Sequence, residues 1–395
     1  MATMATMANM STGSSRPITA APLARLEAIS RARRALLGER GPHQSEGLIQ
    51  PWIERSWQRC LTLGHEPQQV LAFDALSGAA MHRAAESNRA LTEAARPVLH
   101  QLGRALADTH YFAILTNAQG VVVDVNGPID RRDRRADLIT RVGVDLSERS
   151  VGTTAIGAAL AELQPVWLHR GEHFFDATSS YSCAGAPLFG PRGECVGMLD
   201  LTGVDAPERP ELKHLVTQSA RSIENALALV QSHALLLRLN WPGHHLGEDA
   251  DGLIGLDRDG FVTTSNSAAR QMVPQLCGSA ATPAPTHSSE LFALPFEMLF
   301  DAARHDASVM EVPLWSGLLL QALALPPADT DGGGGAVRGA LASRAPAPDQ
   351  RRLKDIETAL IRKAVDEARG NVASAALRLG VSRATVYRKL GRKRS

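Results

Sequence analysis

A group of side chains suited to reading DNA stands near the C-terminal end of the sequence. Arg383, Ala384, Thr385, Arg388 and Lys389 fall within one short stretch, RATVYRKL. On a helix in the major groove, arginine can donate two hydrogen bonds to guanine. Threonine and alanine methyl groups can contact thymine, and lysine can neutralise phosphate. The stretch therefore predicts binding to double-stranded DNA.

Three short helices are predicted to position these side chains within residues 350–395. The first has apolar residues at helical spacing and ends at Gly370, and Gly380 permits a tight turn between the next two. An asparagine and a serine cap the second and third helices by accepting backbone N–H groups. These capping residues and the basic tail complete the predicted DNA-binding set: Asn371, Ser382, Arg392 and Lys393.

The distribution of charge supports this prediction. The chain of 395 residues has a formal net charge of only +1. Residues 351–395 hold 13 Lys and Arg against 4 Asp and Glu, a net of +9, whereas the remainder holds 29 against 37, a net of −8. A small basic module attached to a larger acidic body is typical of a protein that binds a polyanion.

The long segment before this module predicts an α+β multidomain architecture. Residues 1–48 are expected to be a disordered or helical extension, and residues 49–81 a helical lead-in. In residues 82–236 we expect a long helix at 82–108, a hairpin from strands at 111–116 and 121–125, and a helix at about 150–163. Strands are expected at 165–169, 184–189 and 195–202, and a helix over 208–238 closes the unit.

A second α+β pattern is predicted over residues 250–325. The sequence DGLIGLDRDGFVTTSNSAARQM reads as a strand, a turn, a second strand and the start of a helix, and it resembles the opening of a PAS domain. A PAS-like domain is therefore expected here. Residues 326–349 are rich in Gly, Pro and Ala and predict a flexible linker.

The basic module resembles a known family. Residues 353–391, an apolar helix followed by GN and AA-x-x-LG-V-SR-x-T-x-YRKL, are similar to the Fis-type helix-turn-helix that ends many bacterial enhancer-binding proteins. The resemblance implies a homodimer on a palindromic operator, with half-sites about one DNA turn apart. By the same resemblance, the first helix would pair two subunits through Leu353, Ile356, Leu360 and Ile361.

The preceding segment resembles the acetoin-catabolism-regulator group. Four blocks carry this resemblance in the same order: IERSWQRCLTLGHEP, VGVDLSERSVGTTAIGAAL, PVWLHRGEHFF and CAGAPLFGPRGECVGMLDLTG. It implies a GAF sensor domain and control by a small-molecule effector. The sequence CAGAPL departs from the expected serine and alanine after the cysteine, which makes the identity of the effector less transferable from the group.

A GAF or PAS fold places its ligand between sheet and helices. The candidate effector contacts are Phe112, Asp124, Thr153, Trp167, His169, His173 and Cys183. Several have a purely structural alternative, since Thr153 can cap a helix and Trp167 can belong to the core. The two histidines and Cys183 could be metal ligands, but their spacing matches no zinc signature. No metal and no cofactor is therefore predicted.

Regulators of this group usually carry an ATPase domain of about 240 residues between sensor and DNA-binding module, and this domain acts on RNA polymerase holding sigma-54. The corresponding interval here is about 115 residues. The sequence has no Gly-Lys dipeptide for a phosphate-binding Walker A loop, and it lacks GAFTGA. Neither ATP hydrolysis nor direct sigma-54 activation is expected. RNA polymerase stays a possible partner through recruitment.

Two other functions remain open on the sequence. Some GAF domains that stand alone reduce methionine sulfoxide with cysteines, and Cys183 and Cys195 are the candidates for such chemistry. An architectural DNA-binding protein like Fis itself is the second alternative. Neither a membrane-spanning run nor a signal peptide is expected, and the four cysteines form no CxxC, which indicates a reducing bacterial cytoplasm and a place on the nucleoid.

Overall fold

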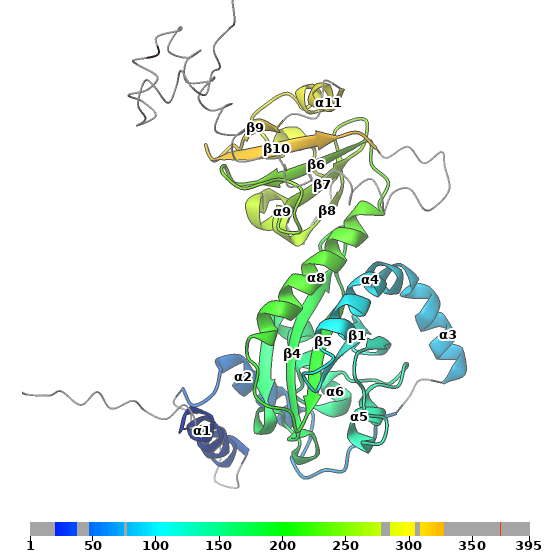
Figure 1. The fold of residues 1–395 in the computed structure, drawn as a ribbon, viewed down its shortest axis with the longest axis vertical. Helices are drawn as coiled ribbons and strands as arrows, with labels where there is room; N and C mark the ends of the chain where they lie inside the picture. Colours follow the sequence, from blue (N-terminus) through cyan, green and yellow to red (C-terminus); the bar gives the residue numbers. More distant parts are fainter. Residues whose placement is uncertain are drawn as a thin grey trace, which may run out of the picture. The chain divides into compact units, whose positions relative to one another are not determined.

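A computed structural model describes residues 20–37, 47–74, 77–277, 285–304 and 309–327, together with Val372 (Figure 1). The chain divides into two compact units, and the first ends at Pro327. The predicted DNA contacts, the predicted dimer contacts and nearly all of the predicted linker lie outside the described residues. Within the described part of the chain, no helix is long and apolar enough to cross a membrane.

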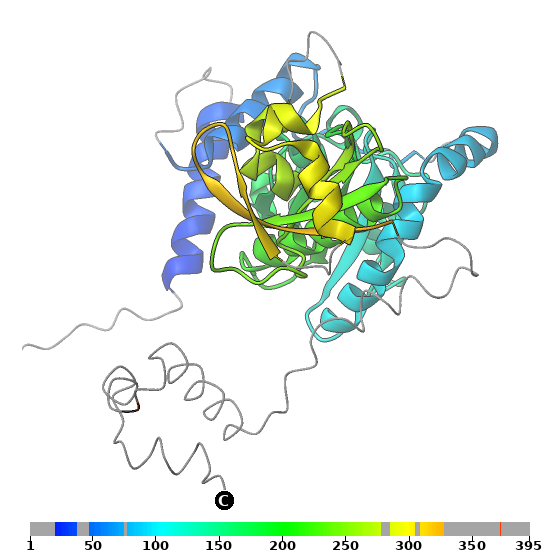
Figure 2. The ribbon, with the colours of Figure 1, turned by 90° about the horizontal axis from the view of Figure 1, so that it is seen from above.

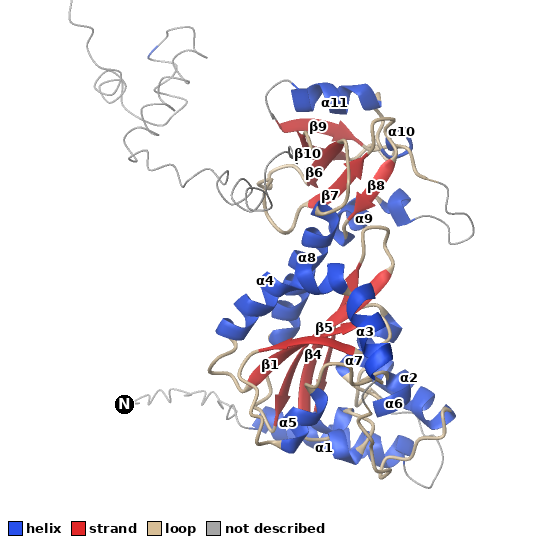
Figure 3. Cartoon of the chain, turned by 90° about the vertical axis from the view of Figure 1, so that its right-hand side faces the viewer, coloured by secondary structure: helices blue, strands red, loops and turns tan. Residues whose placement is uncertain are grey.

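The first of two sheets has the strand order β2-β1-β5-β4-β3, and every pairing is antiparallel. Figure 3 shows its strands in red with helices packed around them. The predicted hairpins are confirmed, because β1 pairs with β2 and β4 with β5. The strands span Tyr111–Asn117, Val122–Asn126, Val166–His169, Tyr181–Phe189 and Cys195–Val204.

Two groups of helices cover the two faces of this sheet, because side chains alternate between faces along each strand. One apolar cluster joins the sheet to α4 and α8, and the other joins it to α1, α2, α5, α6 and α7. The first group, with the preceding α3, spans Gly78–Ser87, Arg89–Ala105 and Leu212–Leu229. The second spans Ala20–Leu37, Pro51–Thr62, Arg134–Ile139, Glu148–Val151 and Ala155–Glu162. Two 3-10 turns, η1 and η2, span Arg170–Glu172 and Asp176–Thr178.

The prediction of one helix over residues 208–238 is wrong at its C-terminal end. Helix α8 stops at Leu229, and β6 (Leu235–Asn240) follows it. Leu235, Leu237 and Leu239 alternate along β6 and pack into the second core. Periodicity alone does not distinguish such a short apolar run in a strand from one in a helix. The predicted helix at 82–108 is likewise two helices, because the chain breaks at Asn88.

The second sheet has the order β8-β7-β6-β10-β9 and is also antiparallel. Figure 2 shows the β9–β10 hairpin in orange. The strand–turn–strand–helix pattern predicted from residue 251 is confirmed by β7, β8 and α9. The remaining strands span Gly252–Leu256, Val262–Ser265, Val309–Pro313 and Leu319–Leu325. The helices α9, η3, α10 and α11 span Ser267–Met272, Pro274–Cys277, Ser288–Leu291 and Phe296–Arg304.

Candidate functional site

A small cavity of about 30 Å³ lies between the first sheet and the N-terminal end of α7. One face of β1, β4 and β5 supplies Ile114, Tyr181, Cys183, Asp200 and Thr202 to its wall, as the alternation of side chains along a strand requires. The rest of the wall comes from the helices and loops that cover this face: Phe73, Ile139, Leu146, Val151, Thr154, Ala155, Ile156, His173 and Thr178.

Two polar side chains on this wall are buried with an unused hydrogen-bonding atom. His173 has no exposed surface and Asp200 is 1% exposed. Among the described residues, neither Nε2 of His173 nor Oδ1 of Asp200 has a hydrogen-bond partner. A buried polar atom left unpaired costs about 1–3 kcal/mol. An unpaired group of this kind calls for an explanation, and a bound ligand is one.

The protonation state of His173 follows from its surroundings. Its Nδ1 lies 2.9 Å from the backbone oxygen of Arg170, which can only accept a hydrogen bond, so Nδ1 carries the proton. Burial lowers the pKa of His173 to about 4, which keeps the ring neutral at physiological pH. Nε2 is therefore a free acceptor, suited to a hydroxyl or amide donor.

The carboxyl group of Asp200 is in the opposite situation. Its Oδ2 accepts a hydrogen bond from Thr202 Oγ1 on the same strand. Burial raises the pKa of Asp200 to about 7, since no ion pair with a described Lys or Arg offsets the loss of water. The group is thus poised between a neutral acid, which donates a hydrogen bond, and a carboxylate, which accepts one.

Cys183 lies beside these groups, but its chemistry is that of a buried thiol. Its Sγ lies 3.2 Å from Thr202 Oγ1. Burial, and after it the nearby Asp200, raises the pKa of the Cys183 thiol well above its ordinary value. Since the thiolate is the nucleophile, this environment disfavours thiol catalysis. The pKa of Cys195, which is half-buried, is also raised by burial.

Of the seven predicted effector contacts, the structure brings His173 and Cys183 together on the cavity wall. Trp167 belongs to the apolar cluster on the opposite face of the sheet, and His169 stacks on it with ring centroids 6.4 Å apart. Side chains alternate between faces along β3, so Trp167 and His169 point away from the face that bears the cavity. The side chains of His169 and Cys183 therefore point to opposite faces of the sheet, which separates two of the ligands of the alternative metal site.

The other three predicted contacts lie outside the cavity wall. Phe112 is buried in the adjoining core, and Asp124 accepts a hydrogen bond from the backbone N–H of Val125 on β2. Thr153 faces α2 instead. No group of three His, Cys, Asp or Glu side chains that could hold a metal occurs within the described ranges.

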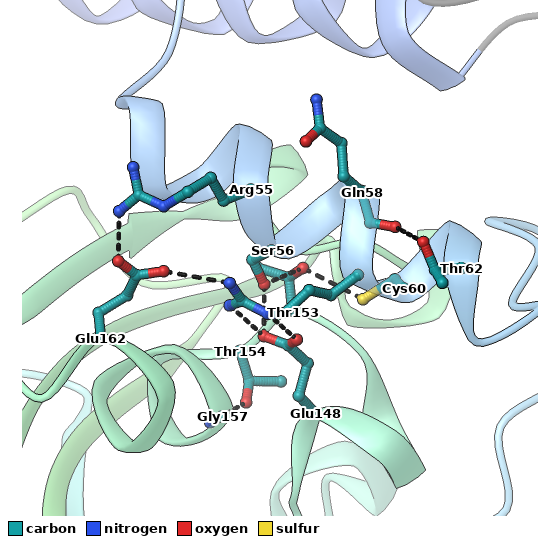
Figure 4. Close-up of polar contacts among 11 residues, drawn as sticks. Arg55, Ser56, Gln58, Cys60, Thr62, Glu148, Thr153, Thr154, Gly157 and Glu162 are labelled. Atoms are coloured by element: carbon teal, nitrogen blue, oxygen red, sulfur yellow. Dashed lines mark hydrogen bonds and ion pairs between the residues drawn. The ribbon is translucent and has the colours of Figure 1, made fainter.

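Thr153 belongs to a polar network that fastens α2 to the helices beside the cavity (Figure 4). Its hydroxyl lies 2.7 Å from Ser56 Oγ, which also donates to Glu148. Arg59 forms ion pairs with Glu148 and Glu162 at 2.6 and 3.2 Å. The next residue, Thr154, caps α7 by accepting the N–H of Gly157 and lines the cavity. The network therefore holds the cavity wall from behind.

Asp200, Thr202 and Tyr181 are cavity residues that sequence reasoning missed. The available signal was the alternation within CVGMLDLTGV, which puts Met198, Asp200 and Thr202 on one strand face. An aspartate in an otherwise apolar strand is unusual, because ionised carboxylates are rarely buried without a partner. That signal identifies the residue but not the helices that enclose it.

Comparison with known proteins gives two family matches. Residues 27–225 match the family model described as "MimR, N-terminal domain", and residues 352–392 match "Bacterial regulatory protein, Fis family". The described cavity thus lies within the first match. The second match covers the predicted helix-turn-helix, which establishes a Fis-type DNA-binding region at this end of the chain.

Individual relatives are transcriptional regulators. The acetoin catabolism regulatory protein of Cupriavidus necator is 31% identical over 262 residues, which cover 64% of this chain and 38% of that protein. MimR of Mycolicibacterium goodii, the propane 2-monooxygenase operon transcriptional activator, is 29% identical over 182 residues, which cover 45% and 30%. The chain thus spans well under half the length of these relatives. A solved Escherichia coli DhaR(N)–DhaL complex is similar over 71% of this chain and 100% of the matched chain, with 16% identity and a TM-score of 0.43.

Proposed function

Since the chain belongs to the family defined by the MimR N-terminal domain, we propose that it is a DNA-binding transcriptional regulator controlled by a small molecule bound in the cavity of the first sheet. The observation that carries this proposal is the pair of buried, unpartnered atoms on the cavity wall, His173 Nε2 and Asp200 Oδ1. In this proposal the domain that contains the cavity is the GAF sensor. The domain of the second sheet, which begins at β6, is the PAS-like domain.

The wall chemistry favours an uncharged ligand with hydrogen-bonding groups. None of the described lining residues is Lys or Arg, so an anionic ligand would lose its water without gaining a cation. A ligand hydroxyl can donate to His173, and a ligand oxygen can accept from protonated Asp200. The cavity of about 30 Å³ admits only a few non-hydrogen atoms. Larger effectors would require the wall to move.

The name of the Cupriavidus relative points to acetoin as the first molecule to test. Acetoin is small and uncharged, and it carries one hydroxyl and one carbonyl group. We propose this class, small neutral alcohols and ketones, for the cavity. Aromatic compounds are the alternative class, and the small volume of the cavity argues against them.

Control of transcription is proposed to act by DNA binding alone. The interval between sensor and Fis-type region is short and the chain has no Gly-Lys dipeptide, which supports a mechanism without ATP hydrolysis or direct sigma-54 activation. Two chains would dimerise through Leu353, Ile356, Leu360 and Ile361, and Arg383, Thr385, Arg388 and Lys389 would contact a palindromic operator. Recruitment of RNA polymerase or occlusion of a promoter would follow.

The effector proposal is tested by thermal denaturation with acetoin and a panel of small alcohols, ketones and aromatics. A ligand that binds only the folded state raises Tm with concentration. We expect a neutral hydroxyl-bearing compound to raise Tm in the wild type, and to raise it less at each concentration in Asp200→Leu, which has no hydrogen-bonding group. Asp124→Asn, on β2 of the same sheet but off the cavity wall, is the matched control. A Tm unchanged by every compound would contradict the proposal.

The DNA-binding proposal has a separate test. Binding to the chain's own upstream region should weaken steeply with salt, because phosphate contacts release counterions. Arg388→Ala should reduce both affinity and sequence preference, whereas Lys393→Ala should weaken binding to all sequences alike. Near-uniform affinity for unrelated DNA would favour the architectural alternative.

A further inference from the structure

Four consecutive backbone carbonyls next to the cavity accept hydrogen bonds from side chains of the two N-terminal helices. They belong to residues 171–174, which follow β3 and include His173. Arg33 on α1 donates to the first, third and fourth, at 3.0, 2.6 and 3.0 Å. Trp57 Nε1 on α2 donates to the second at 2.9 Å. Two side chains therefore satisfy a stretch of backbone that has no strand partner.

Arg33 has a geometry that a lysine cannot reproduce. Its guanidinium also pairs with Asp176 at 2.6 Å and lies 5.7 Å from the centre of the Trp57 ring. Its side chain is only 17% exposed. A planar guanidinium presents several donors in fixed directions, whereas an ammonium is a compact charge with three donors. The arrangement therefore depends on arginine and not only on a positive charge.

A strained residue directly precedes the segment held by Arg33. Arg170 has φ +49°, a left-handed conformation that costs a non-glycine residue about 1–2 kcal/mol. The oxygen of Arg170 accepts both from the N–H of His173 at 3.0 Å and from its ring Nδ1 at 2.9 Å. Such strain persists only where the surroundings hold it in place. The orientation of the His173 ring is thus tied to a backbone that Arg33 fixes from the other side.

We propose that Arg33 is a positioning residue for ligand recognition: it contributes no atom to the cavity wall, but fixes the segment that places His173 there. This inference rests on the proposed function of the cavity. It extends the functional site to α1, although no described residue of α1 lines the cavity.

Helix α1 has a second attachment that keeps it docked when Arg33 changes. Arg25 pairs with Glu172 at 2.9 Å and with Glu208 at 2.7 Å. A change at Arg33 therefore removes the hydrogen bonds to the carbonyls of residues 171, 173 and 174 without removing the helix. Arg33→Lys is the informative variant, because it keeps the charge near His173 and loses the fixed fork of donors. Arg34→Lys, at an exposed position of the same helix, is the matched control.

The test measures His173 directly by NMR in the full-length protein, together with acetoin affinity. For Arg33→Lys we expect amide hydrogen exchange at residues 171–174 to accelerate about tenfold or more, as befits loss of bonds to a charged group. The pKa of His173 should rise from about 4 toward 6.5 as the ring becomes hydrated. Acetoin affinity should fall about tenfold, with Tm confirming a folded protein. Arg34→Lys should change none of these.

The two proposals fail separately. Loosening of His173 in Arg33→Lys would support the positioning role even if acetoin and the compound panel do not bind the wild type, an outcome that overturns only the effector proposal. Unchanged exchange and an unchanged His173 titration in folded Arg33→Lys would overturn the positioning role, whatever binds the cavity. Arg33→Ala provides the more severe version of the same change.

Discussion

Each of the two sheets buries one aspartate, and the two are held in opposite ways. Asp251, at the start of β7, has no exposed surface and receives three hydrogen bonds: from Arg238 at 3.1 Å, Asn240 at 3.1 Å and the N–H of Gly247 at 2.6 Å. Asp200 in the first sheet is equally buried. Within the described residues it receives a hydrogen bond from Thr202 alone, and its Oδ1 has no partner.

The comparison distinguishes a carboxylate with a structural role, Asp251, from a carboxyl group that can still bind a ligand, Asp200. A buried carboxylate is stable when a cation and hydrogen bonds replace its water, as they do at Asp251. Asp200 lacks that replacement, and burial raises its pKa to about 7 instead. The Asp200 carboxyl is thus left incompletely satisfied at the wall of a cavity, whereas both oxygens of Asp251 accept hydrogen bonds.

The largest effect expected from this comparison is on stability at Asp251. Asp251→Asn removes the charge opposite Arg238, whose side chain is only 12% exposed, and turns one acceptor into a donor. Breaking one half of a buried pair costs about 3–5 kcal/mol. Urea denaturation should show a loss of this order in the free energy of unfolding. Asp200→Asn, which breaks no ion pair and keeps the side chain neutral, should not lower it at pH 7. Equal losses would contradict the distinction.

The second effect is a pH dependence that belongs to Asp200. Its pKa is raised from 3.8 to about 7 in the folded state, so the folded state holds a proton that the unfolded chain releases. The resulting stabilisation is complete below the unfolded pKa and is lost as pH rises through about 7. Relative to Asp200→Asn, the free energy of unfolding of the wild type should fall by up to about 1.4 kcal/mol per pH unit between pH 3.8 and about 7. A difference independent of pH would show that Asp200 is ionised throughout.

A third effect concerns ligand binding in the first sheet. Asp200→Leu keeps the approximate size of the side chain but can neither donate nor accept a hydrogen bond. We expect affinity for a hydroxyl- or carbonyl-bearing probe to fall about tenfold, the usual scale for one buried hydrogen bond. Isothermal titration calorimetry of the wild type, Asp200→Leu and Asp124→Asn measures this. Equal affinity for all three proteins would remove Asp200 from the binding site.

The smallest effect is a contrast between two cysteines. Cys183 on the cavity wall is buried and its pKa is raised well above the ordinary value, whereas Cys277, the last residue of η3, is exposed. A thiol reagent should label Cys277 in the folded protein and label Cys183 only on unfolding. Mass spectrometry of labelled peptides reads this directly. Fast labelling of Cys183 in the folded protein would revive the thiol-enzyme alternative.

Local patterns predicted much of the fold. Turns between alternating apolar runs placed both hairpins of the first sheet, and the first hairpin and helix of the second. They failed at β6, because LLLRLN is apolar at both helical and strand spacing and only its pairing with β7 and β10 decides between them. The break between helices at Asn88 could not be predicted either, because the residues on both sides of it favour a helix.

The site was predicted less completely, for a related reason. His173 and Cys183 were identified by residue type and reach the cavity, whereas Trp167 and His169 were equally plausible by type. Their exclusion depends on which face of β3 is covered by α7, a tertiary fact. Asp200 could have been found from strand alternation, but its missing partner is a property of the packed structure alone.

The central claim is that occupancy of the first-sheet cavity controls DNA binding by the Fis-type region. Fluorescence anisotropy with DNA from the chain's own upstream region measures this directly, with and without acetoin or the strongest stabilising compound from the thermal panel. The account predicts that the ligand changes the Kd for DNA about fivefold or more in the wild type and Asp124→Asn, and that Asp200→Leu needs about tenfold more ligand for the same change. A ligand that binds the cavity and leaves the Kd for DNA unchanged in all three proteins would contradict it.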